Sequence, residues 1–255
     1  MKIIWHGTAS IELINKQGRI LFDPFVPLRH STVPVRIEEF DGFTNVFITH
    51  GHFDHILDIP EIVRRNPDVR LYCTKTPCQS LCKKGVPKNN LTQLSFGQSM
   101  EVKGFRILAL HGKHAVLPYR SLSRLAYILK SPARGNIPYI LKQLFMFREN
   151  DETIFYQIES EGSRISLMGS LNLRDDVTYP TGADVLILPY NGWDDNYPPA
   201  VRAIERLRPK RVLLDHFDDT FPPLTSPLDL RPILSYKDHK DIEIRALELH
   251  RITEV

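Results

Sequence analysis

Three histidines and one aspartate lie within six consecutive residues, in the stretch HGHFDH at positions 50–55. In an extended chain, residues two apart point to the same side, so His50 and His52 converge as the preceding apolar run ends. Asp54 and His55 follow where the chain turns into a predicted helix, and they project from a different direction. Imidazole and carboxylate ligands at this density suit zinc, and iron or manganese at a mixed site. Crowding these polar groups at a strand end costs free energy unless they have a partner to bind. The stretch therefore predicts a metal centre.

The elements that position these residues are short apolar runs separated by turn residues, which predict strands. The expected strands are 2–5, 10–14, 19–22, 46–48, 69–73, a hairpin over 101–110, 153–159, 164–168, 184–188 and 211–214. The expected helices are 55–65, 77–84 and 200–208. Residues 26–44 are predicted to be a surface loop, and the tail 225–255 carries an alternation over 242–246 but no chemical motif. Strands early and late with helices between them predict one domain over 1–255, an αββα four-layer sandwich.

The segment 115–148 differs from the rest, because apolar residues at helical spacing surround breaks at two prolines and a glycine. It predicts two short helices inserted between strands. The segment holds six basic and no acidic residues, among them Arg120 and Arg124. It is interpreted as a lid that recruits an anionic substrate through these arginines, as a surface that lies on a membrane, or as a packed subdomain with solvated charges.

Composition and charge argue against nucleic-acid-binding, secreted and membrane-spanning proteins. At 255 residues, 42% hydrophobic and 25% charged, the chain is typical of soluble globular proteins. A net charge of +3 is too small to favour nucleic acid as a partner. The first residues do not resemble a secretory signal, and no apolar stretch approaches the ~20 residues of a membrane-spanning helix. Three clustered cysteines, at 73, 78 and 82, do not form a secreted disulfide framework, so a cytoplasmic location is expected.

The stretch 50–55 resembles the HxHxDH signature of the metallo-β-lactamase superfamily, in the same context of strand, loop and helix. The similarity covers nearly the whole chain, since the motifs ILFDP at 20–24 and LDHFD at 214–218 fall where that fold has them. Within the superfamily the chain looks most like the branch of ascorbate-6-phosphate lactonase-like and N-acyl-phosphatidylethanolamine phospholipase-like hydrolases. The resemblance implies the same fold, with 115–148 as a helical insertion.

The resemblance also implies ligands for one or two metal ions, with zinc expected and iron or manganese possible. His50 and His52 would bind a first ion together with one histidine of the segment 107–115. Relatives whose motif ends in Gly-x-His-Gly or Gly-x-His-Ala indicate His114 for this role. The alternative, His111, would then face a ligand or the substrate.

The second ion would be held by Asp54, His55 and His216. Asp54 would also act as general base, because a bound dication lowers the pKa of water to about 7 and the carboxylate lies beside it. Asp23 is expected either to orient a ligand imidazole by accepting its remaining N–H, or to be an ordinary turn residue before a proline.

One departure from the family concerns Ser170, which stands where an aspartate usually bridges both metals. A neutral hydroxyl is a poor ligand for two dications, so the second site is expected to be weaker, unless Asp175 or Asp176 replaces the missing carboxylate. The remaining histidines are expected to be structural or on the surface: His6, His30, His239 and His250.

The expected function is therefore metal-dependent hydrolysis of an ester-like bond, a phosphodiester or a lactone, in a small anionic or lipid-like substrate. The alternatives are a metal- or ligand-binding protein without turnover, which Ser170 allows, and a nuclease of the same fold. The substrate, the native metal, the number of ions and the oligomeric state are left open by the sequence.

Overall fold

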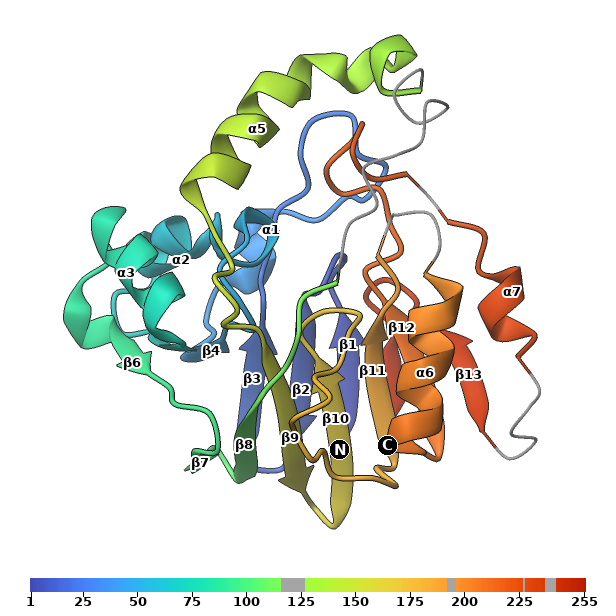
Figure 1. Cartoon of the computed structure of the whole chain (residues 1–255). Helices are drawn as coiled ribbons and strands as arrows, with labels where there is room; N and C mark the ends of the chain where they lie inside the picture. Colours follow the sequence, from blue (N-terminus) through green and yellow to red (C-terminus); the bar gives the residue numbers. More distant parts are fainter. Residues whose placement is uncertain (116–126, 192–195, 227, 237–241) are drawn as a thin grey trace.

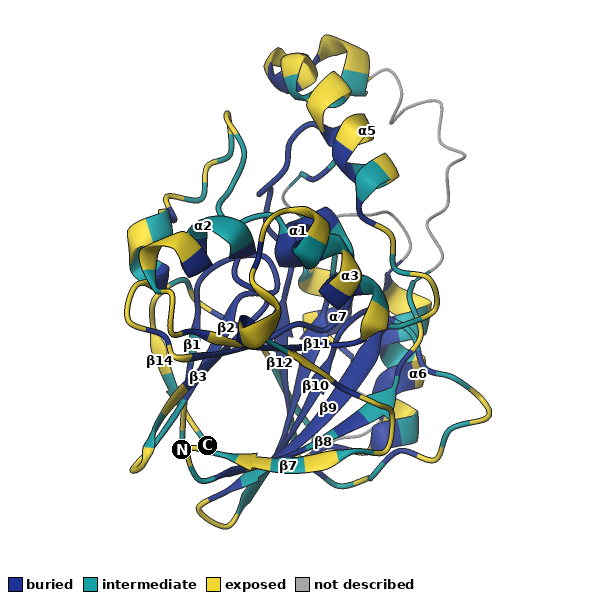
Figure 2. Ribbon diagram, turned by 90° about the vertical axis from the view of Figure 1, so that its left-hand side faces the viewer, coloured by how far each residue is buried: buried dark blue, intermediate teal, exposed yellow. Residues whose placement is uncertain are grey.

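The fold is built on two seven-stranded sheets that face each other (Figures 1 and 2). The computed structural model describes all residues except 116–126, 192–195, 227 and 237–241. The first sheet has the strand order β14-β1-β2-β3-β4-β5-β6. Its strands in chain order are β1 (Lys2–Trp5), β2 (Ile11–Asn15), β3 (Gly18–Phe22), β4 (Asn45–Phe47), β5 (Arg70–Cys73), β6 (Leu91–Gln93) and β14 (Ile252–Glu254).

The second sheet has the order β13-β12-β11-β10-β9-β8-β7. Its strands are β7 (Ser99–Val102), β8 (Phe105–His111), β9 (Ile154–Ser160), β10 (Ser163–Met168), β11 (Val185–Pro189), β12 (Arg211–Asp215) and β13 (Glu243–Ala246). Strands β10 to β13 run parallel, whereas β7 to β10 pair antiparallel. Both sheets are therefore mixed.

Helices cover the outer faces of the sheets, so the predicted αββα sandwich is confirmed. On the first sheet lie α1 (Phe53–Ile56), α2 (Ile59–Arg65) and α3 (Lys75–Lys83), and on the second lie α6 (Tyr197–Leu207) and α7 (Arg231–Leu234). The insertion contributes η3 (Pro132–Asn136) and α5 (Ile137–Met146), which extend away from the sheets (Figure 1). Two further 3-10 turns are η1 (Ile37–Phe40) and η2 (Lys88–Asn90).

Strand register divides the buried side chains between two layers of core. Leu21 pairs with Val46, and Val46 with Leu71, and all three pack under the outer helices. The next rung, which contains Phe22 and Phe47, points to the opposite face and packs against the second sheet. Because both faces are covered, central strands such as β4 (NVF) and β11 (VLILP) are buried at every position, as expected of strands between two layers.

Several strands of both sheets end at one edge of the sandwich. The residues that follow β3, β4, β8, β10 and β12 there include most of the predicted site residues, and β1 ends at the same edge. Parallel register places these loops together, so residues from distant parts of the sequence share one surface. Both chain termini lie at the opposite end (Figure 1).

The predicted helix over 55–65 is wrong in one respect, because it is split into α1 and α2. The edge strands β6 and β14, the helix α7 and the short turn η2 were not predicted. The residues 26–44 were predicted as a loop, and they contain the turn η1. Among the described residues, every helix is too short or too polar to cross a bilayer.

Candidate metal centre

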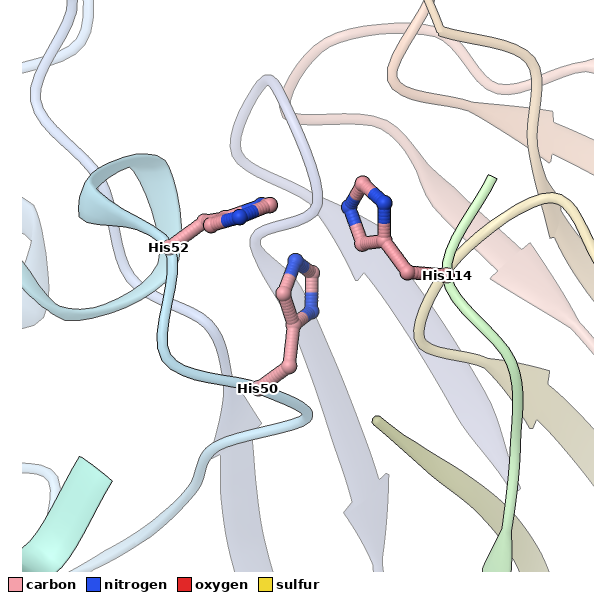
Figure 3. Close-up of side chains that lie close together, drawn as sticks. All are labelled: His50, His52 and His114. Atoms are coloured by element: carbon pink, nitrogen blue, oxygen red, sulfur yellow. The ribbon is translucent and has the colours of Figure 1, made fainter. Parts of the chain in front are cut away.

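Three imidazoles meet at the edge of the sandwich where β4 and β8 end (Figure 3). His50 and His52 flank Gly51 in the loop after β4, and His114 lies in the loop after β8. The ring centroids are 4.9 Å apart for His50 and His52, 5.0 Å for His50 and His114, and 4.4 Å for His52 and His114. One nitrogen of each ring lies within 4.8 Å of the others, so a single ion could be held between them.

The protonation of this group suits a cation. His50 is buried, its Nδ1 lies 3.0 Å from the Thr49 hydroxyl, and its Nε2 has no hydrogen-bond partner. Burial and the neighbouring imidazoles hold the pKa of His50 well below its usual value. Burial and His114 lower the pKa of His52 to about 4, and burial also lowers the pKa of His114. All three rings are therefore neutral at pH 7 and offer lone pairs, as a divalent ion requires.

A second group adjoins the first and contains a carboxylate. Asp54 Oδ2 lies 3.6 Å from His55 Nε2 and 3.3 Å from His216 Nε2. His216 follows β12, which brings it across from the other sheet. The rings of His50 and His55 are only 3.9 Å apart between centroids, so the two groups are neighbours. The separations between the donor atoms fit a second ion, and all three residues are buried.

Asp23 and Thr49 form a buried network behind both groups. Asp23 accepts hydrogen bonds from the Thr49 backbone N–H at 2.8 Å and from its hydroxyl at 2.6 Å. The Asp23 carboxylate also lies 2.9 Å from His55 Nδ1. This bond leaves His55 Nε2 free to face Asp54. The Asp23 carboxylate thus contacts the remaining nitrogen of an imidazole, which is the contact that the orienting role would require.

The second group carries more charge than the first. Burial disfavours charge on His55, but the carboxylates of Asp23 and Asp54 outweigh it and raise its pKa. Burial likewise opposes charge on His216, and the bond to Asp54 raises its pKa. Burial would also disfavour the Asp54 carboxylate, yet these two histidines lower its pKa and keep it ionised. A charged group that contains a carboxylate and a neutral group of imidazoles therefore lie side by side.

His111 lies outside both groups. Its Nε2 donates to the Asp151 backbone carbonyl at 2.7 Å, and its ring stacks on Phe96 at a centroid distance of 3.9 Å. Its own carbonyl accepts a hydrogen bond from the Tyr179 hydroxyl at 2.6 Å. Of the two histidines considered in this segment, the geometry brings His114 to His50 and His52.

Ser170 is buried after β10, next to the loop that carries His114. Its Oγ accepts a hydrogen bond from the Ala115 backbone N–H at 3.0 Å. Asp175 and Asp176 do not replace the missing carboxylate, because they are exposed and pair with Arg202 and Arg174. Within the described part of the chain, no acidic side chain joins the group of His50, His52 and His114.

Two residues of the site were assigned no role from the sequence. Thr49 links Asp23 to both groups, although it stands directly before the HGHFDH stretch. Asp215 precedes His216 and is buried with an unpartnered Oδ1, and burial raises its pKa to about 7. The sequence signal for Asp215 was its place beside a predicted ligand at a strand end.

The insertion touches the centre through its last residue. A Cβ added to Gly51, between the two histidines, would collide with the Arg148 carbonyl oxygen. On the other side, the Asn136 amide donates to the carbonyls of Arg29 and Pro222 at 2.8 and 2.9 Å. The predicted substrate residues, Arg120 and Arg124, lie outside the described residues, as does most of the first predicted helix of the insertion.

Two named relatives share sequence with the chain. A protein of Koribacter versatilis named UPF0173 metal-dependent hydrolase is 27% identical over 241 residues, which cover 93% of each chain. A protein of Metallosphaera sedula with the same family name is 28% identical over 115 residues, which cover 45% of this chain and 50% of that protein.

The fold is similar to that of solved structures as well. Igni18, described as a novel metallo hydrolase from the archaeon Ignicoccus hospitalis, superposes with a TM-score of 0.66 at 19% identity, covering 99% of this chain and 97% of that one. The model of the family described as the β-lactamase superfamily domain matches residues 18–217, which include every residue of both groups. With this match over most of its length, the chain belongs to the β-lactamase superfamily.

Proposed function

We propose that the protein hydrolyses an ester-like bond, a phosphodiester or a lactone, in a small anionic or lipid-like substrate. The family and the names of the two relatives make it a metal-dependent hydrolase, and the bond and the substrate are the proposal. The observation that carries it is the pair of adjoining ligand groups, one of neutral imidazoles and one with a carboxylate.

We assign the first ion to His50, His52 and His114, and the second to Asp54 and its two histidine neighbours. Imidazole nitrogens with one carboxylate favour zinc, with iron or manganese as alternatives at the mixed group. The second group lacks a bridging carboxylate, so we expect it to bind its ion more weakly.

Bound divalent ions would supply a nucleophile at neutral pH and polarise a carbonyl or phosphoryl oxygen. The residues do the rest. Asp54 stays ionised between the two groups and can accept a proton from the attacking water. The contact with Asp23 holds the His55 ring in one orientation. The Thr49 hydroxyl contacts both the Asp23 carboxylate and His50 Nδ1, so it fixes the position of the second group relative to the first.

The insertion supports the substrate class. Helix α5 turns Ile140 and Gln143 inward but exposes Leu141 (59%) and Phe145 (74%). In Figure 2 much of this helix is yellow, the colour of exposed residues. Large exposed apolar side chains beside basic ones, in a segment whose last residue, Arg148, touches the centre, favour an amphiphilic anionic ligand or a lipid surface. A lipid-like substrate also matches the phospholipase-like branch that the sequence resembles.

A turnover panel tests the proposal. Metal-free protein reloaded with Zn²⁺ is assayed on a generic phosphodiester, a simple lactone and anionic phospholipid vesicles. We expect turnover of at least one, lost on chelation and in His52→Ala but retained in His111→Ala, the matched histidine outside the centre. Metal binding without turnover of any substrate would identify a binding protein instead. Turnover that survives chelation would contradict the metal mechanism.

A further inference from the structure

A third group of metal-binding side chains lies apart from the centre, where the two ends of the chain pair. His6 follows β1, Glu39 belongs to η1, and His250 precedes β14. His250 Nε2 lies 2.6 Å from Glu39 Oε2, and His6 Nδ1 lies 3.6 Å from the same oxygen. Their donor atoms are all within 4.8 Å of one another.

The hydrogen bonds of His6 define which nitrogen faces this group. Its Nε2 lies 3.0 Å from Oε2 of the buried Glu12, whose other oxygen contacts Arg19 at 3.3 Å. A carboxylate only accepts, so Nε2 carries the hydrogen and Nδ1 keeps its lone pair. A carboxylate behind the distal nitrogen is the arrangement that commonly orients a histidine ligand and makes it more basic.

The lone pair on His6 Nδ1 is left without a partner. His6 is 8% exposed, and its Nδ1 makes no hydrogen bond among the described residues. It faces a carboxylate oxygen, which is repulsive for a neutral imidazole unless a cation lies between them. Two donors each about 2.1 Å from a tetrahedral ion are about 3.4 Å apart, close to the 3.6 Å between His6 Nδ1 and Glu39 Oε2. The 2.6 Å between His250 Nε2 and the same oxygen is a hydrogen-bond distance, so the exposed His250 side chain would move outward to bind the ion.

Glu39 is held in place and open to solvent. Its Oε1 accepts a hydrogen bond from the Arg36 backbone N–H at 3.0 Å, which leaves Oε2 for the two histidines. The Glu39 side chain is 26% exposed and that of His250 is 41% exposed, so an ion can enter from solvent. Two imidazoles and a carboxylate are the donor set of zinc sites that keep an open position.

We propose that His6, Glu39 and His250 form an additional site for a borderline divalent cation of the Zn²⁺ class, separate from the hydrolytic centre. The ion would join the first strand to the last one and to η1, across almost the whole length of the sequence.

The site would also support the centre indirectly. Two residues after His6, the Thr8 backbone N–H donates to Asp218 at 2.7 Å. The Thr8 carbonyl accepts from the His216 backbone N–H at 2.9 Å. An ion that binds only the folded chain stabilises it, and the gain grows with the logarithm of the free ion concentration once the site is filled.

The test is Zn²⁺ stoichiometry of chelator-treated protein, measured by equilibrium dialysis and elemental analysis, with melting temperature alongside. His250→Asn removes the ligand, and asparagine tolerates the positive φ of 59° at this position. His30→Asn is the matched control, an exposed histidine with φ of 70° outside the group. We expect wild type and His30→Asn to bind one more ion than His250→Asn, and to gain more melting temperature from Zn²⁺.

Two further variants keep the result interpretable. Glu39→Gln should lose the same ion while preserving side-chain shape, and it decides the matter if His250→Asn does not fold. His52→Ala should still bind the ion, which separates this site from the hydrolytic centre. Equal stoichiometry in wild type, His250→Asn and Glu39→Gln would overturn the proposal.

Discussion

The Ser170 hydroxyl accepts a hydrogen bond from the Ala115 backbone N–H, and so holds the residue that follows His114. The hydroxyl thus contacts the residue next to the first group, at the position where the family resemblance leads us to expect a bridging carboxylate. This relationship explains how the loop of His114 keeps its place without that carboxylate.

Ser170→Asp is expected to strengthen the second ion site, because a carboxylate there adds a charged ligand between the groups. We expect the weaker of the two dissociation constants to fall about tenfold or more. The measurement is Zn²⁺ binding in the His250→Asn background, with Ser170→Asn as an uncharged control of equal size. If the parent already binds two ions equally tightly, the argument from the missing carboxylate is wrong.

His114→Ala should lower metal content and reduce kcat/KM by at least about 100-fold, since it removes a ligand rather than a residue behind one. His111→Ala should leave both nearly unchanged and cost about 1 kcal/mol of stability, through the lost bond to the Asp151 carbonyl. Elemental analysis and turnover of the two variants decide the assignment. The opposite order of effects would identify His111 as the ligand.

Two residues of helix α5 should have different roles, one in the stability of the fold and the other in binding to a lipid surface. Ile140 is fully buried, so Ile140→Ala is expected to cost about 2–5 kcal/mol. Phe145 is 74% exposed, so Phe145→Ala should change the free energy of unfolding by less than about 0.5 kcal/mol. If the helix contacts lipid, Phe145→Ala should instead reduce sedimentation with anionic vesicles. Loss of stability in Phe145→Ala without loss of vesicle binding would show a packing role.

The basic insertion should make the affinity for an anionic substrate depend on salt. Dissolved ions limit the range of electrostatic attraction to ~8 Å at physiological ionic strength, and the range shortens as salt is added. Because this attraction acts on substrate binding, KM should rise with salt while kcat changes little. Replacing Arg120 and Arg124 with glutamine should flatten this dependence. A neutral substrate of the same shape is the control, and an equal salt effect on both substrates would refute steering.

Ionisation of the buried Asp58 carboxyl should lower the free energy of unfolding as pH rises. Burial raises its pKa to about 6, although its Oδ2 accepts the Val26 N–H at 2.7 Å. Because the folded state holds the proton more tightly than the unfolded state, stability falls between pH 4 and about 6 and then levels off. Asp58→Asn should remove this slope and be more stable at pH 7.5 by up to about 3 kcal/mol. Parallel denaturant unfolding of both proteins at pH 4.5 and 7.5 measures it, and an unchanged slope in the variant would refute it.

The sequence predicted those elements that depend on residues close together in the chain. The apolar runs became strands, and the stretch HGHFDH contributes His50 and His52 to one group and Asp54 and His55 to the other. The split of the helix 55–65 was also predictable: Pro60 lacks an N–H and clashes with the carbonyl four residues earlier, so α1 ends at Ile56.

The remainder depends on tertiary pairing that no local pattern encodes. The strand β14 has only three residues and exists because it pairs with β1. That pairing also brings His250 to His6, so a histidine predicted to be an isolated surface residue acquires two partners. The choice of His114 came from the family resemblance, since spacing alone favours neither histidine of that segment.

The contact between Gly51 and Arg148 has a consequence for how this architecture can be altered. Position 51 accepts no side chain while the insertion closes over it, because the Arg148 carbonyl occupies the space that a Cβ would need. The insertion is therefore not an interchangeable module. Transplanted onto a scaffold with a larger residue at that position, it would displace the histidines on either side, and its removal here would free the position to vary.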